Sequence, residues 1–204
     1  MLKSVAGKHL LFLMAAEPEF GAELKSRFTP VWTGVGPVEA TLVAAFSITE
    51  HRPDLVISLG SAGSAVLEQA EVYQVSSVSY RDMDASAFGF EKGVTPFLDQ
   101  PKEILLPLTI DGIPSARLST GGNVVSGNAY DSIDADMVDM ETYALMRVCQ
   151  TLNVPLVGLR GISDGKSDVS KYEDWTHYLE IIDQKLANAV DLLEAQLQGG
   201  TIPL

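Results

Sequence analysis

The sequence is short of cysteine, of positive charge and of long apolar runs, and each shortage excludes a class of protein. Cys149 is the only cysteine among 204 residues, so the chain can form no disulfide within itself and offers no thiolate cluster to a metal. The three histidines, His9, His51 and His177, are far apart in sequence, which argues against a zinc site. We therefore expect no metal.

Lysine and arginine together number 14 against 27 aspartates and glutamates, a net charge of −13. Such a field repels nucleic acids and anionic membranes, so we expect neither as a partner. The apolar run at residues 10–16 is too short to cross a bilayer, and the residues before it lack the apolar core of a signal peptide. These features predict a cytoplasmic protein. The chain also lacks a dinucleotide fingerprint and a Lys-Ser/Thr phosphate loop, and we expect no cofactor.

The pattern of apolar residues predicts an α/β protein. Hydrophobic residues make up 46% of the chain, enough for one sizeable core. Apolar runs of strand length alternate with helical patterns. Strands are predicted at residues 10–16, 30–33, 54–60, 72–80, 105–108, 116–118 and 155–160, and helices at 17–27, 38–51, 141–152 and 172–197. We expect a single domain over residues 1–204, with a mixed central sheet covered by helices on both faces.

Two carboxylates stand out because each lies at the end of an apolar stretch. Glu141 follows Val138 and Met140, and Asp164 follows the run 157–159. Strand ends are where open α/β sheets bind ligands, and a carboxylate is costly to bury there unless it has a task. One acid can then bind hydroxyls while the other moves a proton. The simpler alternative for Asp164 is a helix cap.

Three further segments are ambiguous on their own. Gly60-Ser-Ala-Gly63 allows close backbone approach to a ligand, but a tight strand-exit turn explains it equally well. Glu17-Pro-Glu19 has the composition of an ordinary helix start. In the glycine-rich stretch from Thr120 to Tyr130, the tyrosine can stack on a heterocycle or belong to the core.

The order of these segments, rather than any one of them, carries a resemblance. Six segments follow one another along the chain: Thr33-Gly-Val-Gly36, Asp54-Leu-Val-Ile-Ser-Leu-Gly-Ser-Ala-Gly63, Tyr80-Arg-Asp-Met-Asp-Ala-Ser-Ala-Phe-Gly-Phe90, Ser126-Gly-Asn-Ala-Tyr130, Asp139-Met-Glu141 and Arg160-Gly-Ile-Ser-Asp164. This series resembles the 5'-methylthioadenosine/S-adenosylhomocysteine nucleosidases of the nucleoside phosphorylase superfamily, and the likeness runs from Leu10 to the last helix. The resemblance implies a nucleoside phosphorylase-like fold and a small purine nucleoside as the partner.

The resemblance also implies roles for individual residues. Asp164 is expected to protonate the purine at N7, and Glu19 to orient the attacking water. Glu141 is expected to accept the ribose hydroxyls. Substrate-binding positions are implied for Met140, Ser61, Arg160, Ser163, Tyr130, Phe88 and Tyr172, with Tyr130 stacking on adenine. Phe88 is expected to enter the pocket of a neighbouring subunit, which makes a homodimer part of the expectation.

Hydrolysis is favoured over phosphorolysis, because the chain has no Gly-Asp-Pro-x-Arg segment near its N-terminus and Glu19 would repel phosphate. Two departures concern the purine side. Asn128 replaces an expected acid, and the connection at 131–136 is shorter than the helix-bearing segment typical of the family. The alternatives are a nucleosidase for futalosine or AMP, a phosphorylase, or an inactive nucleoside-binding protein. AMP is disfavoured because no cation cluster is present for a 5'-phosphate.

Overall fold

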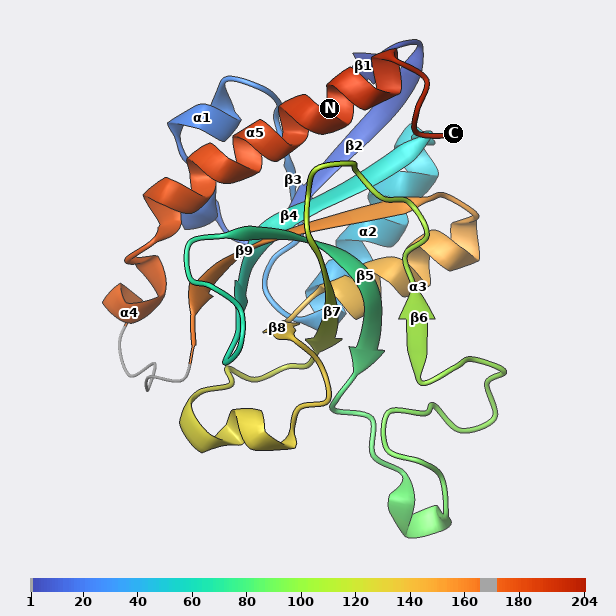
Figure 1. The fold of residues 1–204 in the computed structure, drawn as a ribbon. Coiled ribbons are helices and arrows are strands. Elements are labelled where there is room, and N and C mark those ends of the chain that lie inside the picture. The colour runs from blue at the N-terminus through green and yellow to red at the C-terminus, as the bar shows by residue number, and fades with distance from the viewer. Residues whose placement is uncertain (1, 166–171) are drawn as a thin grey trace.

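The computed structural model describes residues 2–165 and 172–204, and it places one mixed sheet between two helical layers (Figure 1). The strands are β1 (Lys3–Val5), β2 (Lys8–Met14), β3 (Val31–Trp32), β4 (Leu55–Gly63), β5 (Val72–Tyr80), β6 (Glu103–Leu105), β7 (Ser115–Thr120), β8 (Met137–Asp139) and β9 (Leu156–Asp164). The helices are α1 (Ala22–Lys25), α2 (Pro37–His51), α3 (Thr142–Leu152), α4 (Tyr172–Thr176) and α5 (Leu179–Gln198), with 3₁₀ turns η1 (Glu17–Glu19), η2 (Ser86–Phe88) and η3 (Gly127–Ser132). The expected fold class is confirmed.

Five of the strands close into a ring. β4 pairs in parallel with β9, β9 pairs antiparallel with β5, and β5 pairs in parallel with β7. β7 then pairs in parallel with β8, and β8 returns to β4 through Gly63 and Val138. The ring brings the carboxyl ends of β4, β7, β8 and β9 together, although they are far apart in sequence.

Each face of the sheet has its own core because strand side chains alternate between the faces. Phe12 and Ile57 point to the side covered by α5, where Leu186 and Val190 are fully buried. Leu11 and Val56 point to the side covered by α2 and α3. The two layers are visible in Figure 1. Because both faces of the sheet are covered, the central strands are continuous apolar runs.

Two predicted helices are shorter than expected. The helix predicted over 17–27 is split into η1 and α1, and the helix over 172–197 into α4 and α5. The first break occurs at Gly21, where a β-carbon would lie 2.4 Å from the Asp183 carboxylate. In the second, α4 carries the Trp175 indole to Ser61 while α5 packs along the sheet. Tertiary contacts override the helical pattern at both breaks.

The strand pattern is predicted more accurately, with three differences. β1 and β8 have no predicted counterpart, because each has only three residues and no apolar run. The strand predicted at 105–108 lies at Glu103–Leu105, where it pairs with β5. No helix among the described residues combines the length and apolar character needed to cross a bilayer.

Asp183 on α5 binds the backbone at the start of α1. Its carboxylate accepts the backbone N–H groups of Gly21 at 2.9 Å, Glu23 at 2.9 Å and Leu24 at 3.2 Å. These donors belong to the start of α1 and would otherwise lack helical partners. The carboxylate therefore acts as a cap supplied from a distant element.

We predict that Asp183→Asn lowers the free energy of unfolding by about 1–3 kcal/mol, because the amide presents donors to backbone donors. Chemical denaturation measures this loss. Asp191→Asn on the same helix is the control, since Asp191 forms an exposed ion pair with Arg27 and its loss should cost about 1 kcal/mol or less. Equal losses for the two variants would contradict the capping role.

Candidate active site

A cavity of about 280 Å³ opens at the carboxyl ends of β4, β8 and β9. The three acids singled out in the sequence, Glu19, Glu141 and Asp164, all line it. Ser61, Met140, Ser163, Arg81 and Trp175 contribute to the same wall. The structure thus brings Glu19 to two carboxylates that lie more than a hundred residues further along the chain, and the cavity is of a size suited to a small molecule.

Asp164 ends β9 and has a donor on each oxygen. The Ser163 hydroxyl donates to Oδ1 at 2.6 Å, and the Tyr130 hydroxyl donates to Oδ2 at 3.5 Å. Burial raises the pKa of Asp164 above its ordinary value, although the two hydrogen bonds oppose the rise. A carboxyl that retains its proton more readily is suited to act as a general acid.

Glu19 occupies the end of η1 and is bound through one oxygen only. Its Oε1 accepts the backbone N–H of Ser61 at 2.7 Å and the Ser61 hydroxyl at 2.6 Å. The Trp175 indole N–H donates to that hydroxyl at 2.9 Å, so the serine is itself oriented. Within the described residues, Oε2 has no partner although it is buried. Burial also raises the pKa of Glu19.

A second cavity, of about 10 Å³, is also lined by Glu19. Glu141, Arg160 and Ser61 are among the residues around it. Its volume corresponds to about one water molecule, and its polar walls offer the hydrogen-bond partners that a buried water requires. The arrangement can therefore hold a water between Glu19 and Glu141.

Glu141 immediately precedes α3 and faces the chain segment before α2. Its Oε1 accepts the backbone N–H of Gly36 at 2.8 Å. Gly36 has φ of 95°, a conformation open to glycine but costly for other residues, so the donor depends on this residue type. Burial, followed by the charge of Asp139, raises the pKa of Glu141 to about 7.

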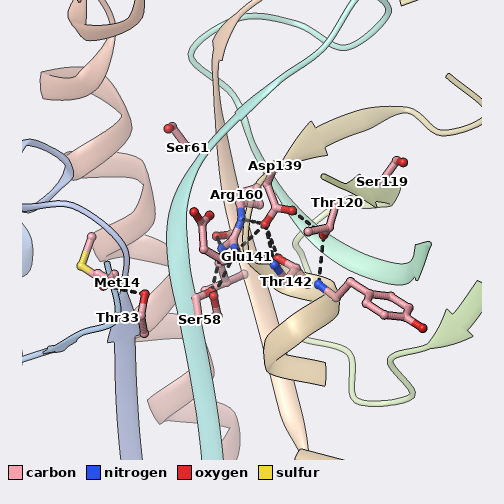
Figure 2. Close-up of polar contacts among 12 residues, drawn as sticks. Met14, Thr33, Ser58, Ser61, Ser119, Thr120, Asp139, Glu141, Thr142 and Arg160 are labelled. Atoms are coloured by element: carbon pink, nitrogen blue, oxygen red, sulfur yellow. Dashed lines mark hydrogen bonds and ion pairs between the residues drawn. The ribbon is translucent and has the colours of Figure 1, made fainter. Parts of the chain in front are cut away.

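A buried polar network underlies Glu141 (Figure 2). Asp139 pairs with Arg160 at 3.0 Å, and the side chains of both are almost fully buried. Thr120 and Thr142 donate their hydroxyls to the two oxygens of Asp139. Arg160 also donates to Ser58 at 2.9 Å. The network joins β4, β7, β8 and β9 to the start of α3.

Four of the predicted substrate-binding residues, Arg160, Tyr130, Phe88 and Tyr172, are not among the described residues that line the large cavity. Arg160 lines the small cavity rather than the large one. Tyr130 directs its hydroxyl at Asp164, and its stacking on a base stays a prediction. Phe88 is 85% exposed on a loop that projects from the sheet (Figure 1). Tyr172 is 59% exposed and packs on Trp175, with ring centroids 5.4 Å apart.

Three site residues are missing from the sequence prediction. Trp175 lines the cavity, but its apolar spacing also fits the stripe of the last helix. Asp139 lies two residues before Glu141, and only its burial with Arg160 reveals its importance. Arg81 follows β5 and donates to backbone carbonyls of Ser119 and Asp139. Arg81 and Asp139 lie within the motifs that carry the resemblance and Trp175 lies in none of them, so spatial contacts are needed to place all three at the site.

Comparison with known protein families identifies the class to which the fold and the site belong. The chain belongs to the phosphorylase superfamily, whose family model matches residues 23–197. The 5'-methylthioadenosine/S-adenosylhomocysteine nucleosidase of Staphylococcus aureus (strain bovine RF122 / ET3-1) is 29% identical over 186 residues, which cover 81% of this chain and 80% of the relative.

Solved structures show the same fold. A 5'-methylthioadenosine/S-adenosylhomocysteine nucleosidase from Colwellia psychrerythraea 34H, in complex with adenine, superposes with a TM-score of 0.77 at 25% identity, covering 92% of this chain and 95% of its own. A futalosine hydrolase mutant of Helicobacter pylori strain 26695 superposes with a TM-score of 0.79 at 20% identity, covering 92% and 98%. The second likeness concerns the fold alone.

The raised pKa of Glu141 predicts a pH-dependent stability. The native protein keeps a proton on Glu141 up to about pH 7, whereas the unfolded chain loses it near 4.5. The native state therefore binds more protons between these values, and its stability through this group falls as the pH rises. The substitution Glu141→Gln removes the titrating group, and with it this fall in stability as the pH rises.

The variant should gain stability over the wild type between pH 5 and pH 8, on the order of 1–3 kcal/mol. Urea unfolding at the two pH values measures the difference. Glu39→Gln, at an exposed position of α2, is the control. A difference between Glu141→Gln and the wild type that does not change with pH would contradict a raised pKa.

Proposed function

We propose that this protein is a nucleosidase that hydrolyses the N-glycosidic bond of 5'-modified adenine nucleosides and releases adenine. The proposed substrates are 5'-methylthioadenosine and S-adenosylhomocysteine. The observation that carries the proposal is the convergence of Glu19, Glu141 and Asp164 on one cavity. The names of the relatives in Staphylococcus aureus and Colwellia psychrerythraea support the choice of substrates.

Asp164 is the proposed general acid. Adenine leaves poorly as an anion, so a proton must reach its N7 as the bond breaks. The Ser163 hydroxyl, 2.6 Å from Oδ1, orients the carboxyl, and burial helps it to retain the proton. A positioned acid contributes about 10²–10⁴ to the rate. The proton passes from Asp164 to the purine, and the glycosidic electron pair leaves with the base.

Glu19 is the proposed base. Its Oε1 is fixed by Ser61, its buried Oε2 has no partner within the described residues, and Glu19 lines the cavity of about 10 Å³. A water held there attacks the anomeric carbon and passes its proton to Glu19. The proposed acid and base thus act on the two groups that replace each other, the leaving purine and the entering water.

Glu141 is the proposed ribose ligand. A carboxylate accepts hydrogen bonds from both the 2'- and 3'-hydroxyls, and its negative charge favours the oxocarbenium-like transition state. Gly36 fixes one oxygen from the opposite side, at 2.8 Å. Met140, half-buried in the wall of the cavity, is proposed to contact the sugar.

Hydrolysis is favoured over phosphorolysis by the charges around the proposed water. A phosphate in that position would meet the carboxylates of Glu19 and Glu141. The guanidinium of Arg160 also borders this cavity, but it is paired with Asp139. Phosphate recognition needs cations and donors that remain available to it. Water has no such requirement.

We predict that Asp164→Asn lowers the turnover of methylthioadenosine by about 100-fold or more, while nucleoside binding largely survives. Chromatography of released adenine measures turnover, and calorimetry with adenosine measures binding. Asp99→Asn, at an exposed loop position, should match the wild type. Near-normal turnover of Asp164→Asn would exclude Asp164 as the acid.

The proposal includes a homodimer. Val38, Leu42 and Phe46 form a stripe along α2 and are 70%, 50% and 75% exposed. Val35, 54% exposed, lies just before this helix and lines the cavity, so the apolar stripe continues to the rim of the site. Exposed apolar residues at i, i+4 and i+8 favour helix-face packing. A second copy seated there is proposed to bring its exposed Phe88 to the 5'-substituent.

Phe46→Glu should convert the protein to a monomer, because a charge in a desolvated interface is costly. Analytical ultracentrifugation measures the mass, and the KM for methylthioadenosine should rise in parallel. Phe88→Ala is the matched variant, which should remain dimeric while its KM rises. A dimer that persists in Phe46→Glu would contradict the placement of the interface on α2.

A further inference from the structure

The ion pair between Asp139 and Arg160 is surrounded by further hydrogen bonds to both of its members. Arg160 Nε and Nη2 donate to Asp139 Oδ2 at 3.2 and 3.0 Å. Nη2 also reaches the hydroxyls of Thr142 at 2.6 Å and Ser58 at 2.9 Å. Asp139 Oδ1 accepts the Thr120 hydroxyl at 2.6 Å. Both members of the pair are therefore held from several sides.

Arg160 faces three carboxylates but pairs with only one of them. It borders the cavity of about 10 Å³ together with Glu19 and Glu141, and its positive charge is felt by both. Across residues 2–165 and 172–204, its one ion pair is with Asp139. A buried guanidinium attracts any nearby anion strongly, so the surrounding contacts must determine which of the three carboxylates pairs with Arg160.

We propose, on the basis of the proposed function, that Asp139 is a positioning residue that holds Arg160 away from Glu19 and Glu141. The two acids that face the ribose and the water then remain without an ion pair. Arg160 stays close enough to moderate their charge but is not free to neutralise either of them.

The contacts of Asp139 with α3 support this role. Its Oδ2 accepts the backbone N–H of Thr142 at 3.0 Å, at the first residue of the helix. Met140 and Glu141 are the two residues between Asp139 and Thr142, so this hydrogen bond closes a short turn around Glu141. The same carboxylate thus sets the direction of Glu141 and the position of the cation beside it.

The charged groups around Glu141 determine what the loss of Asp139 should do. Asp139 on β8 and Glu19 on η1 disfavour the carboxylate form of Glu141, whereas Arg160 on β9 and the Gly36 N–H favour it. Arg81, which follows β5, interacts with both Asp139 and Glu141. Neutralising Asp139 removes one repulsion and releases Arg160 toward Glu141. Both effects shift the titration of Glu141 to lower pH.

The test is Asp139→Asn, followed by the NMR titration of a ¹³C-labelled Glu141 side-chain carboxyl, assigned with Glu141→Gln. The midpoint should fall by about one pH unit or more, and kcat should fall about 10- to 100-fold as Glu141 becomes paired and displaced. Asp183→Asn is the control for loss of a buried carboxylate. It should be destabilised without moving the Glu141 midpoint.

Thr142→Val and Thr142→Ser test the same point if Asp139→Asn does not fold. The valine variant loses the hydroxyl shared by Asp139 and Arg160, and its midpoint should fall, whereas the serine variant retains both. A folded Asp139→Asn or Thr142→Val with an unchanged Glu141 midpoint overturns the proposal. The NMR titration needs no substrate, so it tests the role of Asp139 separately from the proposed nucleosidase activity. The adenine assay tests that activity.

Discussion

The repulsion among buried carboxylates is the constraint on which the site depends. Glu19, Asp139, Glu141 and Asp164 gather at one edge of the sheet, and Arg160 is the cation paired within this group among the described residues. Burying such charges is costly unless each is hydrogen-bonded or protonated. The fold meets this demand with donors from other segments, namely Ser61, Gly36 and Thr120, and with the local hydroxyls of Ser163 and Thr142. The burial that raises the pKa values of Glu19, Glu141 and Asp164 also provides the acid and base properties required for glycosidic cleavage.

Two glycines of β4, Gly60 and Gly63, allow the acids Glu19 and Asp164 to lie close to the backbone of this strand. A β-carbon on Gly60 would lie 3.2 Å from Glu19 Oε1, and one on Gly63 would lie 2.2 Å from the Tyr130 hydroxyl and 2.7 Å from Asp164 Oδ2. Both sides of the proposed reaction, the water at Glu19 and the purine at Asp164, therefore use glycines of one strand. The ring of strands fixes β4 beside β9 and β8, which sets the separation between the acids independently of any ligand.

Much of the fold could be predicted because its strands are apolar on both faces and its long helices are regularly patterned. The three acids could be identified because Glu141 and Asp164 end apolar runs, while Glu19 depended on the family resemblance. The short strand β8, the break that places Trp175 on Ser61, and the capping of α1 by Asp183 could not be predicted. Each depends on a contact between segments more than a hundred residues apart or on a strand of three residues. Asp139 belongs to a recognised motif, but its role could not be predicted because its partner Arg160 lies on another strand.

The release of adenine from methylthioadenosine and S-adenosylhomocysteine, with and without added phosphate, tests the central claim most directly. If Glu19 activates water, adenine should appear at the same rate in both conditions, and the second product should be a free 5'-modified ribose. A requirement for phosphate, with a ribose 1-phosphate as the product, would contradict the hydrolytic role of Glu19. The absence of adenine in either condition would contradict the proposed substrates.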